Sequence, residues 1–178
     1  MDRSTVSEQE AITAFLATPT TETYSALFRV MAPRVLGYFR VRGCEPALAE
    51  DLTQEVMLAV YRQSRQLNNS ESFRPWLFKI ARNALLQDRR KRTRQPQAVD
   101  LEDVALPESD PLASLQFAQW MKALDAEERE LIRLRYVEGL EYHQIAELLR
   151  MPLGTVQWKV FQSKKKLAAR FGAAAGTT

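Results

Sequence analysis

Apolar residues recur along this chain at the spacing i, i+3, i+4 and i+7, which is typical of amphipathic helices. The pattern predicts an all-α protein. Helices are expected over residues 23–41, 46–65, 113–123 and 126–137, and two more within 141–171. A further helix is expected to start at residue 73 and to run into the basic segment that follows it. Residues 1–20 are expected to form a loose lead-in, with a short helix around residues 8–16. Pro33 is expected to kink or split the helix over 23–41.

The segment Glu141 to Phe171 is predicted to form two helices with a tight break between them. Its two inward stripes are Tyr142, Ile145, Ala146 and Leu149, then Val156, Val160, Ser163 and Leu167. Pro152 and Gly154 are expected to turn the chain at the break, and the second helix is expected to start near Leu153. This pattern is typical of a helix-turn-helix, whose second helix enters the major groove of DNA. The alternative is an αα-hairpin with a solvated basic face.

Composition and charge narrow the class of protein. The chain has 178 residues, of which 46% are hydrophobic and only 6 are glycine, so one or two small folded helical domains are expected. Cys44 is the only cysteine, which excludes an internal disulfide and favours a reduced, structural side chain. The polar N-terminus lacks an apolar signal core and no segment reaches the length of a membrane span. We therefore expect a cytoplasmic protein with no membrane partner.

The helix predicted over residues 46–65 is strongly amphipathic. Its inward residues are Leu48, Leu52, Val56, Ala59 and Val60. The outward residues are Asp51, Gln54, Glu55 and Arg62. The two acids, Asp51 and Glu55, lie one turn apart, and their like charges slightly weaken the helix. Two interpretations stay open, namely an ordinary solvated face and a docking surface for a basic partner.

A polar loop, LNNSES, precedes a helix that combines aromatic and basic residues. Its predicted inward stripe is Phe73, Trp76, Leu77, Ile80 and Ala84. Between Arg82 and Arg94 there are six basic residues and one acid, which gives a net charge of +5. Such a density indicates a polyanionic partner. A polar loop beside aromatic and cationic side chains is what the recognition of single-stranded nucleic acid needs.

Residues 95–112 differ from both flanking parts. They hold three prolines, five acids and no base, which predicts a flexible acidic linker. The predicted organisation is therefore an N-terminal helical domain over 1–95, a linker over 96–112 and a C-terminal helix-turn-helix domain over 113–178.

Three segments, in this order, resemble the successive motifs of the extracytoplasmic-function (ECF) sigma factors of bacterial RNA polymerase. They are AEDLTQEVMLAVYR, FRPWLFKIARNALLQDRRKR and LDAEERELIRLRYVEGLEYHQIAELLRMPLGTVQWKVFQSKKKL, and the resemblance covers roughly residues 22–171. It implies a transcription initiation factor that directs core RNA polymerase to promoters. It also implies that the minus-thirty-five element is recognised as duplex and the minus-ten element as a melted single strand.

The resemblance implies roles for the N-terminal surfaces. Asp51, Gln54 and Glu55 match the helix that docks on the β′ clamp helices of the polymerase. The loop from Asn68 to Ser72 matches the one that receives a flipped minus-ten base. The residues implied in minus-ten binding are Asn68, Asn69, Ser70, Glu71, Ser72, Trp76, Lys79, Arg82, Asn83, Arg89, Arg90, Lys91 and Arg92.

The helix from Leu153 matches the one that reads the minus-thirty-five element. Its implied contact residues are Thr155, Gln157, Trp158, Lys159, Gln162, Lys164, Lys165 and Lys166. Where this chain has Trp158 and Lys159, the family often has a small polar residue and an arginine, so the promoter sequence is not predicted. Glu141 stands where a Ser or Thr N-cap is common, which predicts a weaker helix start. The resemblance also implies the polymerase β flap and an anti-sigma factor as partners.

Two other classes of function remain to be considered for this sequence. A stand-alone helix-turn-helix regulator would bind duplex DNA without polymerase. An enzyme is not expected, because the sequence shows no catalytic constellation, no glycine-rich phosphate loop and no cluster with metal-ligand spacing. We therefore expect neither a cofactor nor a metal, and we interpret His143 as a surface residue of its helix.

Overall fold

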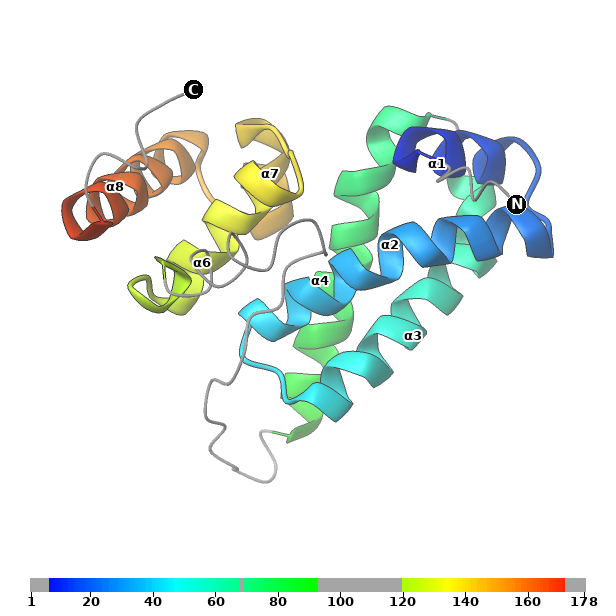
Figure 1. Ribbon diagram of the computed structural model, residues 1–178, viewed down its shortest axis with the longest axis horizontal. Coiled ribbons are helices and arrows are strands. Elements are labelled where there is room, and N and C mark those ends of the chain that lie inside the picture. Colours follow the sequence, from blue (N-terminus) through cyan, green and yellow to red (C-terminus); the bar gives the residue numbers. More distant parts are fainter. Residues whose placement is uncertain (1–6, 68, 93–119, 172–178) are drawn as a thin grey trace. The chain divides into compact units, whose positions relative to one another are not determined.

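The computed structural model describes residues 7–67, 69–92 and 120–171, and every regular element in these ranges is a helix (Figure 1). The all-α prediction is therefore confirmed. The chain forms two compact units, one from residues 1–36 and 47–97, the other from residues 37–46 and 98–178. The acidic segment 96–112 and most of the helix predicted over 113–123 lie outside the described residues.

The described residues of the N-terminal half form four α-helices and two short 3₁₀ turns. They are α1 (Glu8–Ala17), α2 (Thr21–Val41), α3 (Pro46–Gln63), η1 (Ser64–Gln66), η2 (Ser70–Ser72) and α4 (Phe73–Arg92). Helix α2 continues through Pro33 without a break, so the expected split is not observed. Residues 37–46 belong to the second unit. They comprise the end of α2, the turn after it and the first residue of α3.

The short helix expected around residues 8–16 is observed as α1, but it packs as part of the first unit and is not a loose lead-in. Ser7 caps its N-terminus in a capping box with Glu10, whose carboxylate accepts from the Ser7 amide at 2.8 Å. Ala11, Ile12 and Phe15 are fully or almost fully buried. The short helix is thus fixed both by its cap and by one apolar face.

Helix α4 turns a different face inward from the one predicted. Its buried residues are Phe73, Leu77, Phe78, Ala81 and Leu85. Trp76, Ile80 and Ala84, which were expected to point inward, are half-buried at the edge of the core. The predicted and the observed stripes both follow helical spacing, and they share Phe73 and Leu77. Packing against the other helices decides which of the two stripes is buried. As a result, Trp76 keeps part of its indole at the surface.

The second unit contains the helix-turn-helix. Its described elements are α6 (Ala126–Ile132), the π-helical segment η3 (Arg133–Val137), α7 (Tyr142–Leu149) and α8 (Leu153–Phe171). Asp125 caps α6 in a capping box with Glu128. Gly139 has a φ of 70°, which ends the preceding helix as the sequence predicts.

The turn between α7 and α8 is made by a residue that the sequence did not indicate. Arg150, at the end of α7, has φ 56° and ψ 46°, the left-handed conformation. Gly154 lies inside α8 and meets nothing within 4 Å, so its small size is not what allows the turn. The start of α7 is also better satisfied than expected, because the Gln144 side chain accepts from the Glu141 amide at 2.8 Å.

Charged groups are buried inside the second unit. The Arg133 guanidinium and the Glu138 carboxylate are 0% exposed and lie 3.0 Å apart. Gly37 approaches this arginine so closely that a Cβ atom at position 37 would clash with its guanidinium. Glu130 accepts a hydrogen bond from Tyr38 at 2.7 Å and pairs with Arg42 at 2.7 Å. A polar network therefore ties residues 37–46 to the rest of this unit.

Candidate nucleic-acid interface

Helix α8 presents a continuous outer face. Val156, Val160 and Ser163 are buried and hold the helix against its own unit. On the other side Trp158 is 60% exposed and Phe161 is 63% exposed. Phe161 was not predicted as a contact residue, although it follows Trp158 by three positions and so shares its face. Two exposed aromatic rings at the middle of a helix-turn-helix second helix can reach bases in a major groove.

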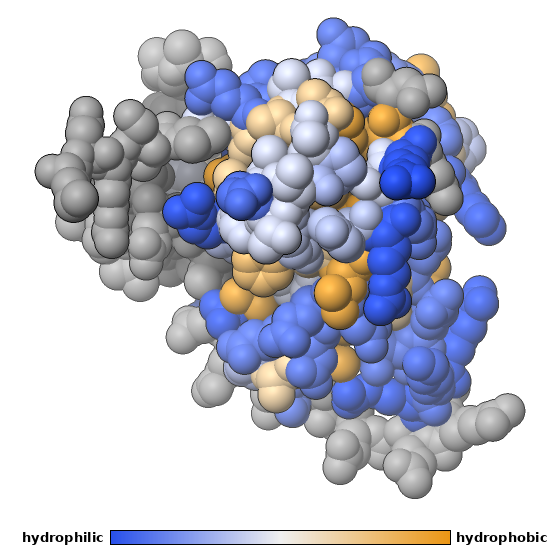
Figure 2. Space-filling model, turned by 90° about the vertical axis from the view of Figure 1, so that its right-hand side faces the viewer, coloured by the Kyte–Doolittle hydropathy of each residue, from blue (hydrophilic) through white to orange (hydrophobic). Residues whose placement is uncertain are grey.

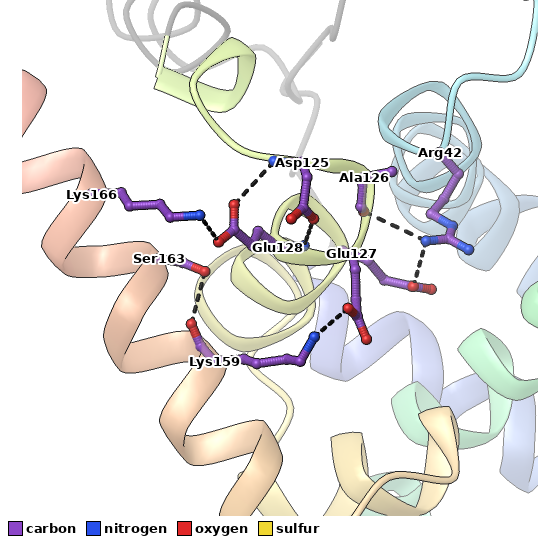
Figure 3. Close-up of polar contacts among 9 residues, drawn as sticks. Arg42, Asp125, Ala126, Glu127, Glu128, Lys159, Ser163 and Lys166 are labelled. Atoms are coloured by element: carbon purple, nitrogen blue, oxygen red, sulfur yellow. Dashed lines mark hydrogen bonds and ion pairs between the residues drawn. The ribbon is translucent and has the colours of Figure 1, made fainter.

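Two lysines assigned to DNA binding are engaged by acids of the same unit. Lys159 donates to Glu127 and Lys166 donates to Glu128, both at the start of α6 (Figure 3). The hydrogen bond to Glu128 raises the pKa of the Lys166 ammonium above its ordinary value. The two ion pairs connect α8 to the start of α6 at two positions, Lys159 and Lys166. The role of these lysines in DNA binding stays a prediction.

The other two lysines of α8, Lys164 and Lys165, have different surroundings. The ammonium of Lys164 lies 5.6 Å from the centre of the Tyr136 ring, within the range of a cation–π interaction. Lys165 is exposed and has no partner among the residues that the structure describes. Of the three consecutive lysines, Lys166 pairs with an acid, Lys164 lies over an aromatic ring, and Lys165 makes neither contact with a described residue.

The loop before α4 and the outer face of α4 form one surface of the first unit. Asn69 accepts from the amide of Glu71 at 2.8 Å and so shapes the 3₁₀ turn η2. Lys79 and Asn83 are exposed and Trp76 is half-buried, and the spacing 76, 79, 83 places all three on one face. Asn68 lies outside the described residues.

The basic end of α4 continues this surface. Arg89, Arg90, Lys91 and Arg92 are exposed, while Arg82 is half-buried. Arg92 pairs with Asp88 one turn earlier at 2.9 Å, and the other cations of this segment outnumber that single acid. The end of the helix is therefore a cationic surface next to a polar loop and an aromatic side chain.

The outer face of α3 carries the three residues predicted for polymerase docking. Asp51, Gln54 and Glu55 are all exposed. The same face continues with Leu58, 49% exposed, and Tyr61, 43% exposed, which sequence analysis did not single out. Apolar residues also reach the surface in patches between hydrophilic ones on the side of the first unit shown in Figure 2. This face of α3 therefore combines acidic groups with two exposed apolar side chains, and its role in polymerase docking stays a prediction.

Among residues 7–67, 69–92 and 120–171, no three His, Cys, Asp or Glu side chains are grouped as a metal ion would require. None of the helices in the described part of the chain is both long and apolar enough to cross a membrane.

Comparison with known proteins assigns both halves of the chain. Residues 27–95 match the family model of Sigma-70 region 2, and residues 114–167 match that of Sigma-70, region 4. The ECF RNA polymerase sigma factor EcfG of Rhodopseudomonas palustris is 33% identical over 132 residues, which are 68% of this chain and 70% of the relative. The chain belongs to the ECF sigma factors. This sigma factor is also 29% identical, over 85% of its length and 90% of the relative's, to the RNA polymerase sigma factor CarQ of Myxococcus xanthus.

Solved structures share the fold of this sigma factor. The sigma factor RpoE of Bartonella quintana, solved in complex with the anti-sigma factor NepR, matches with a TM-score of 0.66 at 21% identity. That match covers 84% of this chain and 96% of the other. CnrH, solved in complex with the cytosolic domain of CnrY, matches with a TM-score of 0.59 at 20% identity, over 94% and 98% of the two chains.

Membership of the family establishes the coarse function. The protein is a transcription initiation factor that directs RNA polymerase to promoters, and its family is not one of enzymes. The match of residues 27–95 to region 2 also gives the N-terminal half a role that a stand-alone helix-turn-helix regulator would not need.

Proposed function

We propose that this sigma factor divides promoter recognition between its two units, reading the minus-thirty-five element as duplex and the minus-ten element as separated single strand. The observation that carries the proposal is the different chemistry of the two exposed surfaces. Helix α8 offers Gln157, Trp158 and Phe161 on one outward face, which suits base edges in a major groove. The η2–α4 surface instead joins a polar loop, the Trp76 indole and cations, which suits unstacked bases and a backbone.

Strand separation and base recognition are coupled on the η2–α4 surface. Taking a base out of the stack costs a few kcal/mol, so a surface that captures the unstacked base stabilises the open state and selects the base at once. The exposed arginines at the end of α4 would hold the phosphates of the same strand. Trp76 would stack on a base, and Asn69 and Asn83 would contact base edges.

Core RNA polymerase would dock on the outer face of α3. Asp51, Gln54 and Glu55 form its acidic part, and Leu58 and Tyr61 extend it with apolar area. The proposed partner surfaces on the polymerase are the β′ clamp helices for this face and the β flap for the second unit. Because the RpoE structure contains an anti-sigma factor, we also propose a partner of that class for this chain.

Reversing the acids of α3 tests the docking proposal. The variant D51K/E55K is expected to lower affinity for core RNA polymerase at least tenfold, because two exposed attractive charges become repulsive in the interface. The affinity is measured by fluorescence titration of labelled full-length protein with core enzyme. Glu22→Lys provides a control with a single charge reversal, because Glu22 is an exposed acid on α2 and not on α3, and it should leave affinity within about twofold. Equal affinities for the three proteins would contradict docking on this face.

The lysines of α8 give a second test, on DNA. Lys165→Ala is expected to reduce the salt slope of binding to a short mixed-sequence duplex by about one unit, because one phosphate contact is lost. Lys166→Ala should reduce the slope by less, because Glu128 already offsets the charge of this lysine. The slopes come from binding isotherms of the full chain over a range of salt concentrations. A larger loss for Lys166→Ala than for Lys165→Ala would contradict this assignment of the cations.

A further inference from the structure

Helix α1 precedes the residues that match the sigma region 2 family model, yet it is firmly seated in the first unit. The Phe15 ring lies 5.9 Å from the ring of Tyr24 on α2 and 6.4 Å from that of Tyr61 on α3, measured between ring centres. Phe15 itself is fully buried. Since one face of α1 is anchored in this way, the residues of its first turn have fixed positions.

Glu8, the first residue of α1, joins this helix to two others. One carboxylate oxygen lies 2.7 Å from the Arg34 guanidinium on α2, and the other accepts from Arg74 Nε on α4 at 2.6 Å. The Glu8 side chain is only 14% exposed. Charge-assisted hydrogen bonds that are shielded from water are among the stronger polar contacts in proteins. Arg74 is the second residue of α4, which immediately follows the proposed minus-ten loop, so Glu8 fixes the outgoing end of that loop.

Gln9, the next residue, contacts the loop itself. Its side-chain amide donates to the Ser70 hydroxyl at 3.1 Å, and α1 packs directly against the η2 turn. The turn also has internal restraints of its own, namely the hydrogen bonds from the Glu71 amide to the Asn69 side chain and from the Phe73 amide to the Ser70 carbonyl. The loop is therefore held at Ser70 and at Arg74 by two consecutive residues of a helix that lies more than sixty positions away in the sequence.

We propose that α1 positions the minus-ten loop, so that Glu8 and Gln9 determine how selectively the sigma factor captures its minus-ten base without touching DNA themselves. The inference rests on the proposed single-strand role of the η2–α4 surface. A loop that is already held in its binding conformation loses less conformational entropy when the base enters. It also keeps its polar groups at fixed places, so that wrong bases find mismatched donors and acceptors.

The test uses holoenzyme assembled from core RNA polymerase and the full chain. Open complexes are selected from a promoter library with randomised minus-ten and minus-thirty-five elements, and the recovered sequences give the base preference at each position. Glu8→Gln keeps the shape of the side chain and removes its charge, and Gln9→Ala removes the contact to Ser70. Each is expected to reduce the preference at one or two minus-ten positions by about three- to tenfold, the effect of losing one hydrogen bond in a positioned site. The minus-thirty-five preferences should not change.

Two matched controls accompany these variants. Glu22→Gln and Gln63→Ala make the same chemical changes at exposed residues elsewhere in the N-terminal half, and both preferences should stay as in the wild type. A uniform loss of open complexes with unchanged base ratios would show that α1 only supports the fold, and would overturn the inference. A wild-type holoenzyme with no base preference in the minus-ten region would instead overturn the proposed single-strand function.

Amide hydrogen exchange supplies a readout that does not depend on DNA. Because the loop loses a tether in each variant, amides of residues 69–74 should exchange several-fold faster in Glu8→Gln and Gln9→Ala than in the wild type. Amides in the buried part of α3 should be unaffected. Unchanged exchange in the loop would contradict a positioning role for α1 even if activity were altered.

Discussion

Replacing Arg133 by methionine is expected to destabilise the second unit by about 3–5 kcal/mol, because it removes the guanidinium that pairs with the buried Glu138 carboxylate. Both side chains are 0% exposed, so water cannot take the place of the guanidinium. A loss of this size approaches the whole stability of many small domains. Urea unfolding of the full chain measures it, and hydrogen exchange of α7 and α8 peptides assigns the change to the second unit.

The double variant R133M/E138L separates the charge from the packing. Because it removes both buried charges and keeps apolar volume, it should recover most of the stability that the single variant loses. Arg135→Met is the matched control, since Arg135 pairs with Glu141 at the surface and its loss should cost only about 1 kcal/mol. A double variant as unstable as Arg133→Met would show that the ion pair is not the cause.

Removing the aromatic and amide groups of the α4 surface is expected to have the largest effect on activity. W76A/N83A should lower promoter-dependent transcription by about 10- to 100-fold, because stacking on an aromatic side chain contributes about 1–3 kcal/mol per base. Trp76 is half-buried, so Trp76→Phe serves as the control that keeps packing and stacking. The assay is run-off transcription by holoenzyme on a promoter that the wild type selects from a random library. Equal transcript yields would contradict single-strand capture by α4.

The sequence predicted the long helices well because their apolar stripes are regular. The start of α8 at Leu153, the end of the helical segment before α7 at Gly139 and the extent of α4 all follow from periodicity and from turn residues. The α1 packing was missed, although Ser7 and Glu10 form the S-x-x-E signal of a capping box. Residues 1–20 are nevertheless rich in polar side chains, and this composition favoured the prediction of a loosely packed segment.

Other features could not be predicted because they depend on contacts between elements. The left-handed Arg150 has none of the intrinsic preference that made Gly154 the expected turn residue. The pairs of Lys159 and Lys166 with Glu127 and Glu128 depend on where α6 lies beside α8. The choice between two stripes on α4, one with Trp76 inside and one with Phe78 inside, was equally a matter of packing.

The most direct measurement of the division between the two units is permanganate footprinting of open complexes beside a duplex-binding titration, with the same holoenzymes and the same selected promoter. Asn83→Ala is expected to reduce thymine reactivity in the minus-ten region while leaving affinity for minus-thirty-five duplex within about twofold. Gln157→Ala is expected to do the reverse, weakening duplex discrimination by about 1–3 kcal/mol at one or two positions. If Asn83→Ala abolished upstream duplex binding and left strand opening intact, the proposed division would be wrong.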